Sequence, residues 1–245
     1  MNTAGTGALS SIGYLMMLAA AIASAALVLG QLGPRLRAPR PGALALFAVV
    51  AVPSLIELGW HGIYSALSRQ PSLIRAHHQY WRLLTSALVQ DGGVAGTIFN
   101  LVVLFLIATL AVCVWGAGRT IGLFAVGAIG FNLMATYAFA SSGGGNSGAT
   151  FFLATSLVGL AVVRLRSARA LAAAAVVVAV GAALIATNDA HGVPILCGLV
   201  IGAALALVSP PREPARTGAG AARAQWRSSY GRASQTKYSK VSVRY

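Results

Sequence analysis

Three polar residues whose types suit nucleophilic catalysis lie near the beginnings of long apolar runs. Ser147 begins one run, His191 opens another, and Asn100 lies in the second turn of a third. A serine hydroxyl is a weak nucleophile until a base removes its proton, and a neutral imidazole is the usual base. An amide N–H aimed at the developing oxyanion completes the set. The three residue types indicate acyl-transfer chemistry, provided that the fold brings them together.

The glycine-rich stretch before Ser147 fits such a site. The sequence SSGGGNSGAT covers 141–150, and glycine is costly to order and packs no side chain. We expect Gly143 to Gly145 to let this loop approach its neighbours closely, and Gly148 to make room for the last apolar run. At a helix start, Ser147 also has unpaired N–H groups and the positive end of the helix dipole beside it, which favour a bound oxyanion.

Membrane-spanning helices must position these residues. Hydrophobic residues make up 57% of the 245, charged residues only 9%, and just four residues are acidic. Soluble domains carry about 25% charged residues, so this chain cannot coat a soluble surface. One span needs about 20 apolar residues, and length and flanking signals predict seven spans. The predicted spans cover 8–31, 42–59, 94–115, 120–140, 147–163, 170–187 and 190–208.

The net charge of +14 comes from basic residues that avoid the apolar runs. This distribution argues against nucleic acid as a partner and follows the positive-inside rule. With the N-terminus outside, Arg69, Arg75 and Arg82 are the basic residues that face outward. The three runs that carry Asn100, Ser147 and His191 then all begin at the outer surface. The three residues therefore lie at comparable depth. The excess of Arg over Lys fits a GC-rich bacterial genome, so we expect a multi-pass protein of the bacterial plasma membrane with a cytoplasmic C-terminus.

Composition divides the chain into three parts. Residues 1–41 predict an extra N-terminal span and a basic inner linker, and the start lacks the basic region of a signal peptide. Residues 42–208 hold six spans, with 60–92 as an aromatic, interfacial outer loop. Residues 209–245 are basic and rich in Pro, Gly and Ser. We expect them to form a disordered cytoplasmic arm attracted to anionic lipid.

At these residues the chain resembles the rhomboid intramembrane serine proteases. Four motifs occur in that family's order and spacing over roughly residues 42–208. They are Gly145-Asn146-Ser147-Gly148 for the G-x-S-G motif, Ala190-His191 for the "AH" position, Tyr80-Trp81-Arg82 for the W-R motif of the first outer loop, and Phe99-Asn100 for the "FN" of the next helix.

The resemblance implies an all-α, polytopic membrane helix bundle with a six-helix core and one added N-terminal helix. It implies a catalytic dyad of Ser147 and His191 without a third acid, which needs no cofactor. Phe151 occupies the position of an aromatic ring that lies against the histidine in the family. The substrate class implied is a transmembrane segment of another protein, cut near the outer face.

Supporting roles are predicted for several other residues. Asn100 and the backbone N–H of Ser147 would hold the oxyanion, and Gly145 and Gly148 would shape the loop. Gly198 and Gly202 form a GxxxG face for close helix packing. Trp81 belongs to the interfacial loop, and Arg82 is interpreted as a structural anchor of that loop.

Other interpretations stay open at this stage. Ser147 is also a residue type that caps helices, and Asp189, two residues before His191, is interpreted as a cap that points away from the imidazole. Glu57 is a candidate ion-pair partner for a loop arginine. A zinc site at His77 and His78 lacks further ligands of convincing spacing, so we predict no metal.

Two departures from the family pattern support a second hypothesis. The family often has a histidine where this chain has Gly96, and a glycine where it has Pro194. The alternative function is therefore a catalytically silent rhomboid-like protein that binds transmembrane helices or serves as a subunit of a membrane complex. A transporter is disfavoured, because paired charges within the spans are absent.

Overall fold

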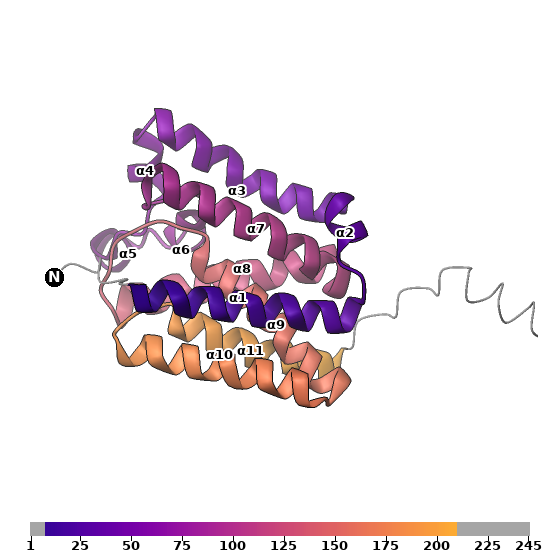
Figure 1. Ribbon diagram of the computed structural model, residues 1–245. Helices are drawn as coiled ribbons and strands as arrows, with labels where there is room; N and C mark the ends of the chain where they lie inside the picture. Colours follow the sequence, from indigo (N-terminus) through magenta and orange to yellow (C-terminus); the bar gives the residue numbers. More distant parts are fainter. Residues whose placement is uncertain (1–7, 210–245) are drawn as a thin grey trace, which may run out of the picture. The chain divides into compact units, whose positions relative to one another are not determined.

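The computed structural model describes residues 8–209, so the predicted arm at 209–245 lies outside the described residues except for Ser209. The described part is helical, with no strand beyond an isolated bridge between Arg69 and Gly143. Figure 1 shows the helices side by side along one direction. The long helices are α1 (Ala8–Leu29), α3 (Pro41–Gly59), α7 (Gly93–Trp115), α8 (Ala117–Tyr137), α9 (Ser147–Leu165), α10 (Ala168–Ala186) and α11 (Gly192–Val208).

Six of these helices are long and apolar enough to span a membrane, and α11 is a shorter apolar helix of 17 residues. Each long helix occupies one of the seven predicted runs. Seventeen residues is the lower end of the length range for transmembrane helices. The chain is therefore a multi-pass membrane protein built as an all-α helix bundle.

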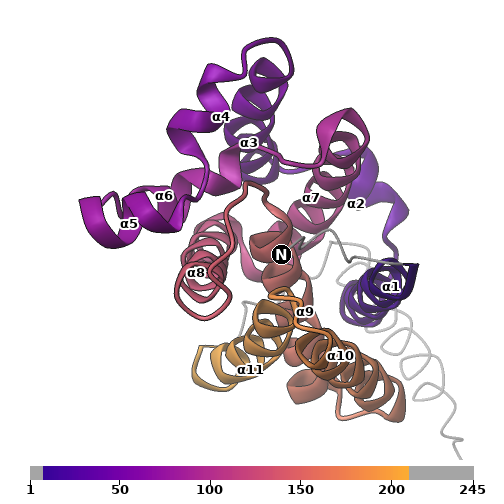
Figure 2. The same cartoon turned by 90° about the vertical axis from the view of Figure 1, so that its left-hand side faces the viewer.

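Helix α9 lies at the centre of the bundle. It is the most buried of the six candidate spans, and it packs against α1, α7, α8, α10 and α11. Figure 2 shows these five helices around it in a view along the bundle. A residue at the start of α9 is therefore surrounded by the ends of its neighbours, which is what a multi-residue site requires.

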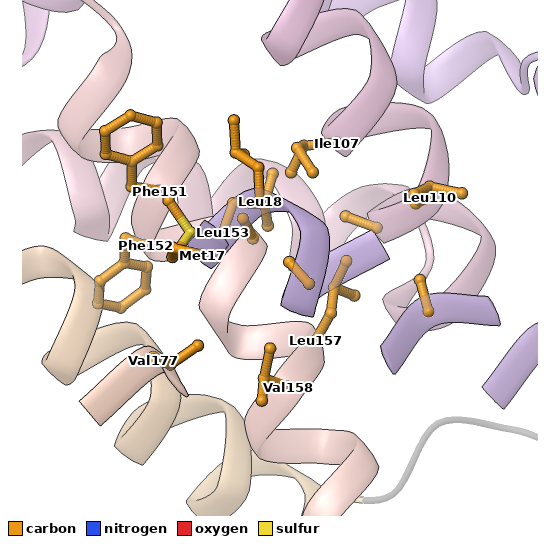
Figure 3. Close-up of a cluster of buried hydrophobic side chains, with 14 of the residues drawn as sticks. Met17, Leu18, Ile107, Leu110, Phe151, Phe152, Leu153, Leu157, Val158 and Val177 are labelled. Atoms are coloured by element: carbon orange, nitrogen blue, oxygen red, sulfur yellow. The ribbon is translucent and has the colours of Figure 1, made fainter. Parts of the chain in front are cut away.

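The N-terminal helix α1 is part of this core. It packs against α7, α9 and α10, and its Met17 and Leu18 are buried in one cluster with Phe151 and Leu153 of α9. Figure 3 shows side chains from these helices meeting in this cluster. Because α1 begins at the same end of the bundle as α9 and α11, its first turns reach the level of Ser147. We call this end the Ser147 end.

The segment 60–92 folds into short helices at the Ser147 end. They are α4 (Gly62–Leu67), α5 (Pro71–His77), α6 (Arg82–Thr85) and a 3₁₀ turn at Ser86–Leu88. The guanidinium of Arg82 is buried and donates to the carbonyl oxygens of Ser65 and Ser68. Burial lowers the pKa of Arg82, yet the group stays charged at neutral pH because arginine starts far above it. These contacts match the anchoring role predicted for Arg82.

Two other residues near this segment differ in how they are placed. The Trp81 side chain is 56% exposed, as expected for an interfacial ring. Glu57 at the end of α3 is buried, and its Oε2 accepts a hydrogen bond from the backbone N–H of Gln90 at 2.8 Å. The idea of a Glu57–arginine ion pair is wrong for the described residues. A carboxylate at this depth is satisfied by a nearby backbone donor without the cost of burying a second charge.

Candidate active site

Ser147 and His191 lie within proton-transfer distance of each other. The Ser147 Oγ is 2.9 Å from His191 Nε2. Asn146 is the N-cap of α9, so Ser147 is the first residue of the helix, and its hydroxyl contacts the imidazole. The capping interpretation of Ser147 is therefore wrong. The two side chains come from positions 44 residues apart, and the packing of α11 on α9 brings them together.

Small residues allow this packing. A Cβ added to Gly198 would lie 2.3 Å from the carbonyl oxygen of Phe152, and one added to Gly202 would lie 2.2 Å from that of Ser156. From the other side, a Cβ at Gly159 would lie 2.1 Å from the carbonyl oxygen of Leu199. Any larger residue would push the two backbones apart. The predicted GxxxG face is confirmed, and Pro194 sits in the first turn of α11, where proline is tolerated.

Three aromatic rings surround the His191 imidazole. Phe131 of α8 stacks on it with ring centroids 4.9 Å apart, Tyr14 of α1 meets it edge-on at 5.4 Å, and Phe151 lies tilted at 5.7 Å. The prediction that Phe151 lies against the histidine agrees with this arrangement. Sequence reasoning missed the other two rings, because nothing local to α1 or α8 indicates that they converge on α11.

Gly148 allows the close approach of a different helix from the predicted one. A Cβ at this position would lie 2.3 Å from the ring of Phe131. Gly148 thus makes room for Phe131 of α8, and the interpretation that it makes room for the last helix is wrong. Its effect still reaches His191, since Phe131 can stack on the imidazole only if it lies this close to α9.

Asp189 lies against the imidazole, and the interpretation that it points away is wrong. Its Oδ1 lies 2.7 Å from His191 Nδ1 and accepts the backbone N–H of the same residue at 3.0 Å. Its Oδ2 accepts a hydrogen bond from the hydroxyl of Tyr14. His191 itself is the N-cap of α11, and Asp189 binds its backbone N–H from the turn at Asn188, whose φ is +60°, so that the carboxylate contacts both the backbone and the ring of His191. We call Tyr14, Asp189 and His191 the imidazole cluster.

The contacts determine where the protons lie. Burial alone would raise the pKa of Asp189, but the hydrogen bonds and charge of His191 and the Tyr14 hydroxyl outweigh it and lower this pKa to about 2. An ionised carboxylate only accepts, so Nδ1 of His191 must donate to it. A neutral imidazole carries one N–H, and Nε2 is then free to accept the proton of Ser147. This is the tautomer that a general base needs.

Asn100 belongs to a network of amides near Ser147. Its Nδ2 donates to Gln90 Oε1 at 2.8 Å. The Nε2 of Gln90 donates to Asn146 Oδ1 at 2.8 Å and to Ser54 Oγ at 3.1 Å, and Asn146 in turn donates to the backbone oxygen of Asn100 at 3.3 Å. Gln90 is only 2% exposed. We call Gln90, Asn100 and Asn146 the amide cluster.

Gln90 is a central residue that sequence reasoning missed. It stands between a short apolar stretch and Asp91-Gly92, so its local context is that of a turn. The available signal was a long amide side chain next to the loop that follows the interfacial segment. Gly96, at the position of the family's histidine, contributes no side chain, and it is Gln90 that contacts Asn100.

Gly145 leaves room for one small group between Ser147 and the amide cluster. A Cβ on this residue would lie 3.6 Å from Ser147 Oγ, 3.7 Å from Gln90 Oε1 and 3.9 Å from Asn100 Nδ2. Its φ of +153° is one that other residues rarely adopt. The first helical hydrogen bond of α9 runs from Thr150 N to Asn146 O, so the N–H groups of 147–149 have no partner within the helix. The space is thus bordered by the Ser147 hydroxyl and the side-chain amides of Gln90 and Asn100, close to a helix N-terminus.

The loop before Ser147 is held against the segment 60–92. Gly145 N donates to Ser86 O at 2.8 Å, and Arg69 and Gly143 exchange backbone hydrogen bonds. A Cβ at Gly143 would lie 2.6 Å from Asp91 Oδ2. The predicted close approach of Gly143 to Gly145 is confirmed. Its purpose is to fix the loop on the same segment that supplies Gln90.

The comparisons with known proteins add no family to this description. No protein-family model matches the chain, and neither does a curated protein. The likeness to rhomboid proteases therefore rests on the four sequence motifs and remains a prediction.

Proposed function

We propose that this protein is an intramembrane serine protease of rhomboid type, which cleaves transmembrane segments of other membrane proteins. The 2.9 Å contact between Ser147 Oγ and His191 Nε2 carries the proposal. Two further features support it: the contact with Asp189 gives the histidine the tautomer of a base, and the serine stands at a helix N-terminus. Both groups are also partly exposed, with 22% of the His191 side chain accessible.

The reaction follows from these contacts. Ser147 Oγ attacks the carbonyl carbon of the scissile peptide while His191 Nε2 takes the hydroxyl proton. The resulting imidazolium gives this proton to the leaving amine as the C–N bond breaks, which leaves an acyl ester on Ser147. A water molecule, deprotonated by His191, then attacks the ester and releases the second product and the free hydroxyl.

The oxyanion formed in both steps needs donors that are already in place. The backbone N–H of Ser147, which has no partner within α9, would supply one donor, and Asn100 Nδ2, 3.9 Å from a Cβ placed on Gly145, would supply another. One such donor typically contributes about 3–4 kcal/mol to transition-state stabilisation. Gln90 Oε1 binds the first amide proton of Asn100, so the amide group has one rotational state, and its second proton is the one left for a substrate oxygen.

The positive-inside rule predicts how the protein is oriented in the membrane. The Ser147 end carries Arg69, Arg75 and Arg82, whereas the connections at the other end carry more basic residues, including Arg164 and Arg166. We therefore place the Ser147 end and the N-terminus outside and the C-terminus in the cytoplasm of a bacterium. The substrate would be cut near the outer face, and the basic arm at 209–245 would bind anionic lipid of the inner leaflet.

A fluorophosphonate probe tests the proposal, because it phosphonylates only serines activated by a base. We expect the purified protein in detergent micelles to be labelled at Ser147, with no label in Ser147→Ala. A known rhomboid protease, treated in parallel, shows that the conditions are adequate. If that enzyme is labelled and this protein is not, while it remains folded, the protease proposal is wrong and a role in binding membrane helices replaces it.

A further inference from the structure

A hydrogen-bonded chain connects the N-terminal helix to the nucleophile. It runs from the Tyr14 hydroxyl to Asp189 Oδ2, from Asp189 Oδ1 to His191 Nδ1, and from His191 Nε2 to Ser147 Oγ. We propose that Asp189 and Tyr14 are positioning residues for His191, so that α1 is a working part of the catalytic centre. This inference rests on the proposed function. It adds Asp189 as a third residue and Tyr14 as a fourth to the expected dyad.

The Asp189 carboxylate orients and stabilises the base. Its contact at Nδ1 selects the tautomer with a free Nε2 and prevents rotation of the ring. As Ser147 gives up its proton, the imidazole gains a positive charge 2.7 Å from the carboxylate oxygen. The side chain of Asp189 is only 12% exposed, so water screens this attraction little. The interaction is therefore stronger in the transition state than in the resting enzyme, which is the condition for accelerating a reaction.

Tyr14 holds the carboxylate in this orientation. Asp189 Oδ1 is bound by both the backbone N–H and the ring of His191, whereas Tyr14 provides the contact at Oδ2. The Tyr14 ring packs on Phe151 with centroids 5.0 Å apart and meets the imidazole edge-on. One turn further along α1, Met17 and Leu18 are buried against α9, as Figure 3 shows. The hydroxyl is thus fixed by the packing of a whole helix.

The competing explanation is that Asp189 only caps α11. Asparagine is as good a cap as aspartate, so a pure cap predicts that Asp189→Asn keeps wild-type reactivity. A positioning carboxylate predicts a large loss, because the amide carries no charge and can offer its N–H to Nδ1, which selects the wrong tautomer. The groups that face His191 are Tyr14 from α1, Asp189 from the preceding turn and Ser147 from α9, with the Arg69 guanidinium behind the Phe131 ring.

The test measures the rate of fluorophosphonate labelling of Ser147 across pH 5 to 9 in the full-length protein. We expect Asp189→Asn to slow labelling by roughly 10²- to 10⁴-fold at neutral pH. Loss of the negative charge also moves the acidic limb of the pH profile to lower pH, because the imidazolium is then less favoured. Asp189→Glu, which restores the charge, should recover part of the rate.

Tyr14→Phe keeps the ring and its packing but removes the hydroxyl. We expect labelling to slow by about tenfold, the effect of one hydrogen bond to a charged group. Tyr137→Phe, an exposed tyrosine of α8 at the same end of the bundle, is the matched control and should label at the wild-type rate. Thermal unfolding of each variant separates loss of rate from loss of fold.

The outcomes distinguish this inference from the proposed function. Absence of labelling in the wild type overturns the proposed function. Normal labelling in the wild type, in folded Asp189→Asn and in folded Tyr14→Phe overturns the positioning role alone and leaves a Ser147–His191 dyad. A loss of rate in Asp189→Asn without a shift of the acidic limb of the pH profile to lower pH would also contradict the electrostatic role of the carboxylate.

Discussion

The imidazole cluster and the amide cluster both lie near the Ser147 hydroxyl, and they differ in charge and in exposure. The imidazole cluster contains the ionised carboxylate of Asp189 and the partly exposed ring of His191, both from the turn before α11. Helix α1 contributes the Tyr14 hydroxyl. The amide cluster is neutral, and its Gln90 and Asn146 are fully buried, with their amide groups paired.

Under the proposed protease function, this difference corresponds to two tasks in acyl transfer. A base must change its charge, so it needs a counter-charge and access to water. An oxyanion hole must not move, so it needs dipoles whose orientation is fixed before the substrate arrives. The buried, paired amides of Gln90 and Asn146 hold the Asn100 amide in such an orientation, because a rotation would leave a polar group unpaired at high cost. We therefore expect damage to the imidazole cluster to lower the rate, and damage to the centre of the amide cluster to lower stability.

The largest expected effect is on the base. His191→Ala should slow fluorophosphonate labelling of Ser147 by about 10⁴-fold or more, as for a base that acts together with its nucleophile. The melting temperature should fall moderately, because Asp189 loses its contact at Nδ1 and the three rings lose a packing partner, so the rate is compared only among folded variants. His61→Ala, an exposed histidine at the same end of the bundle, is the control and should label normally. Substantial labelling of His191→Ala would show that the reactivity of Ser147 does not depend on His191.

Next in size is the loss of the proposed oxyanion donor. Asn100→Ala should slow labelling by about 10²- to 10³-fold, the usual effect of removing one such donor. Binding of a non-reactive substrate segment should be almost unchanged, because the donor acts on charge that develops in the transition state. The ratio of the labelling rates of wild type and variant measures this effect. A variant with the wild-type rate would mean that the Asn100 amide serves only to pair with Gln90.

A stability defect is expected at the centre of the amide cluster. Gln90→Ala leaves buried oxygens of Asn146 and Ser54 without their donor and removes the acceptor of Asn100. We expect the free energy of unfolding to fall by about 2–4 kcal/mol, measured by thermal or denaturant unfolding in detergent. Gln31→Ala, at an exposed position, should change it by less than about 0.5 kcal/mol. Equal stability of the two variants would contradict the structural role of Gln90.

The smallest effect is a pH dependence of stability. The pKa of Asp189 is lowered from 3.8 to about 2, so its stabilising contribution is fully present above about pH 4 and is lost as pH falls through 2. Allowing for solvent screening, we expect about 1–2 kcal/mol. The stability difference between wild type and Asp189→Asn should therefore shrink from pH 5 to pH 2. A constant difference would show that the carboxylate is not held by these contacts.

Sequence reasoning correctly predicted the helices and the end of the bundle at which the polar residues lie. The seven apolar runs correspond to the seven long helices, and the topology placed Asn100, Ser147 and His191 at one end of the bundle. The GxxxG face at Gly198 and Gly202 was predicted from spacing, and the structure places it against α9. These predictions succeeded because each depends on a regular, local property, namely apolar length, helical rise or the absence of side chains.

The contacts within the site were predicted less well. Asp189 was assigned to a cap alone, because two residues of separation in a helix would point the side chains apart, and the left-handed turn at Asn188 changes that direction. Gly148 was assigned to the wrong neighbour, and Gln90 was overlooked. Tyr14 carried only a weak signal, a polar aromatic residue near the start of an apolar run. In each case the partner lies far away in the sequence.

The sequence by itself determined that this chain is a membrane helix bundle and at which depth its polar residues lie, because a long apolar run has one favourable solvent and a helix has a constant rise. Only the tertiary structure decided which way each side chain points around its helix and which helices are neighbours. Those two properties depend on the packing of the whole bundle. They bring Tyr14 of α1 to Asp189, and Asp189 to the imidazole beside Ser147.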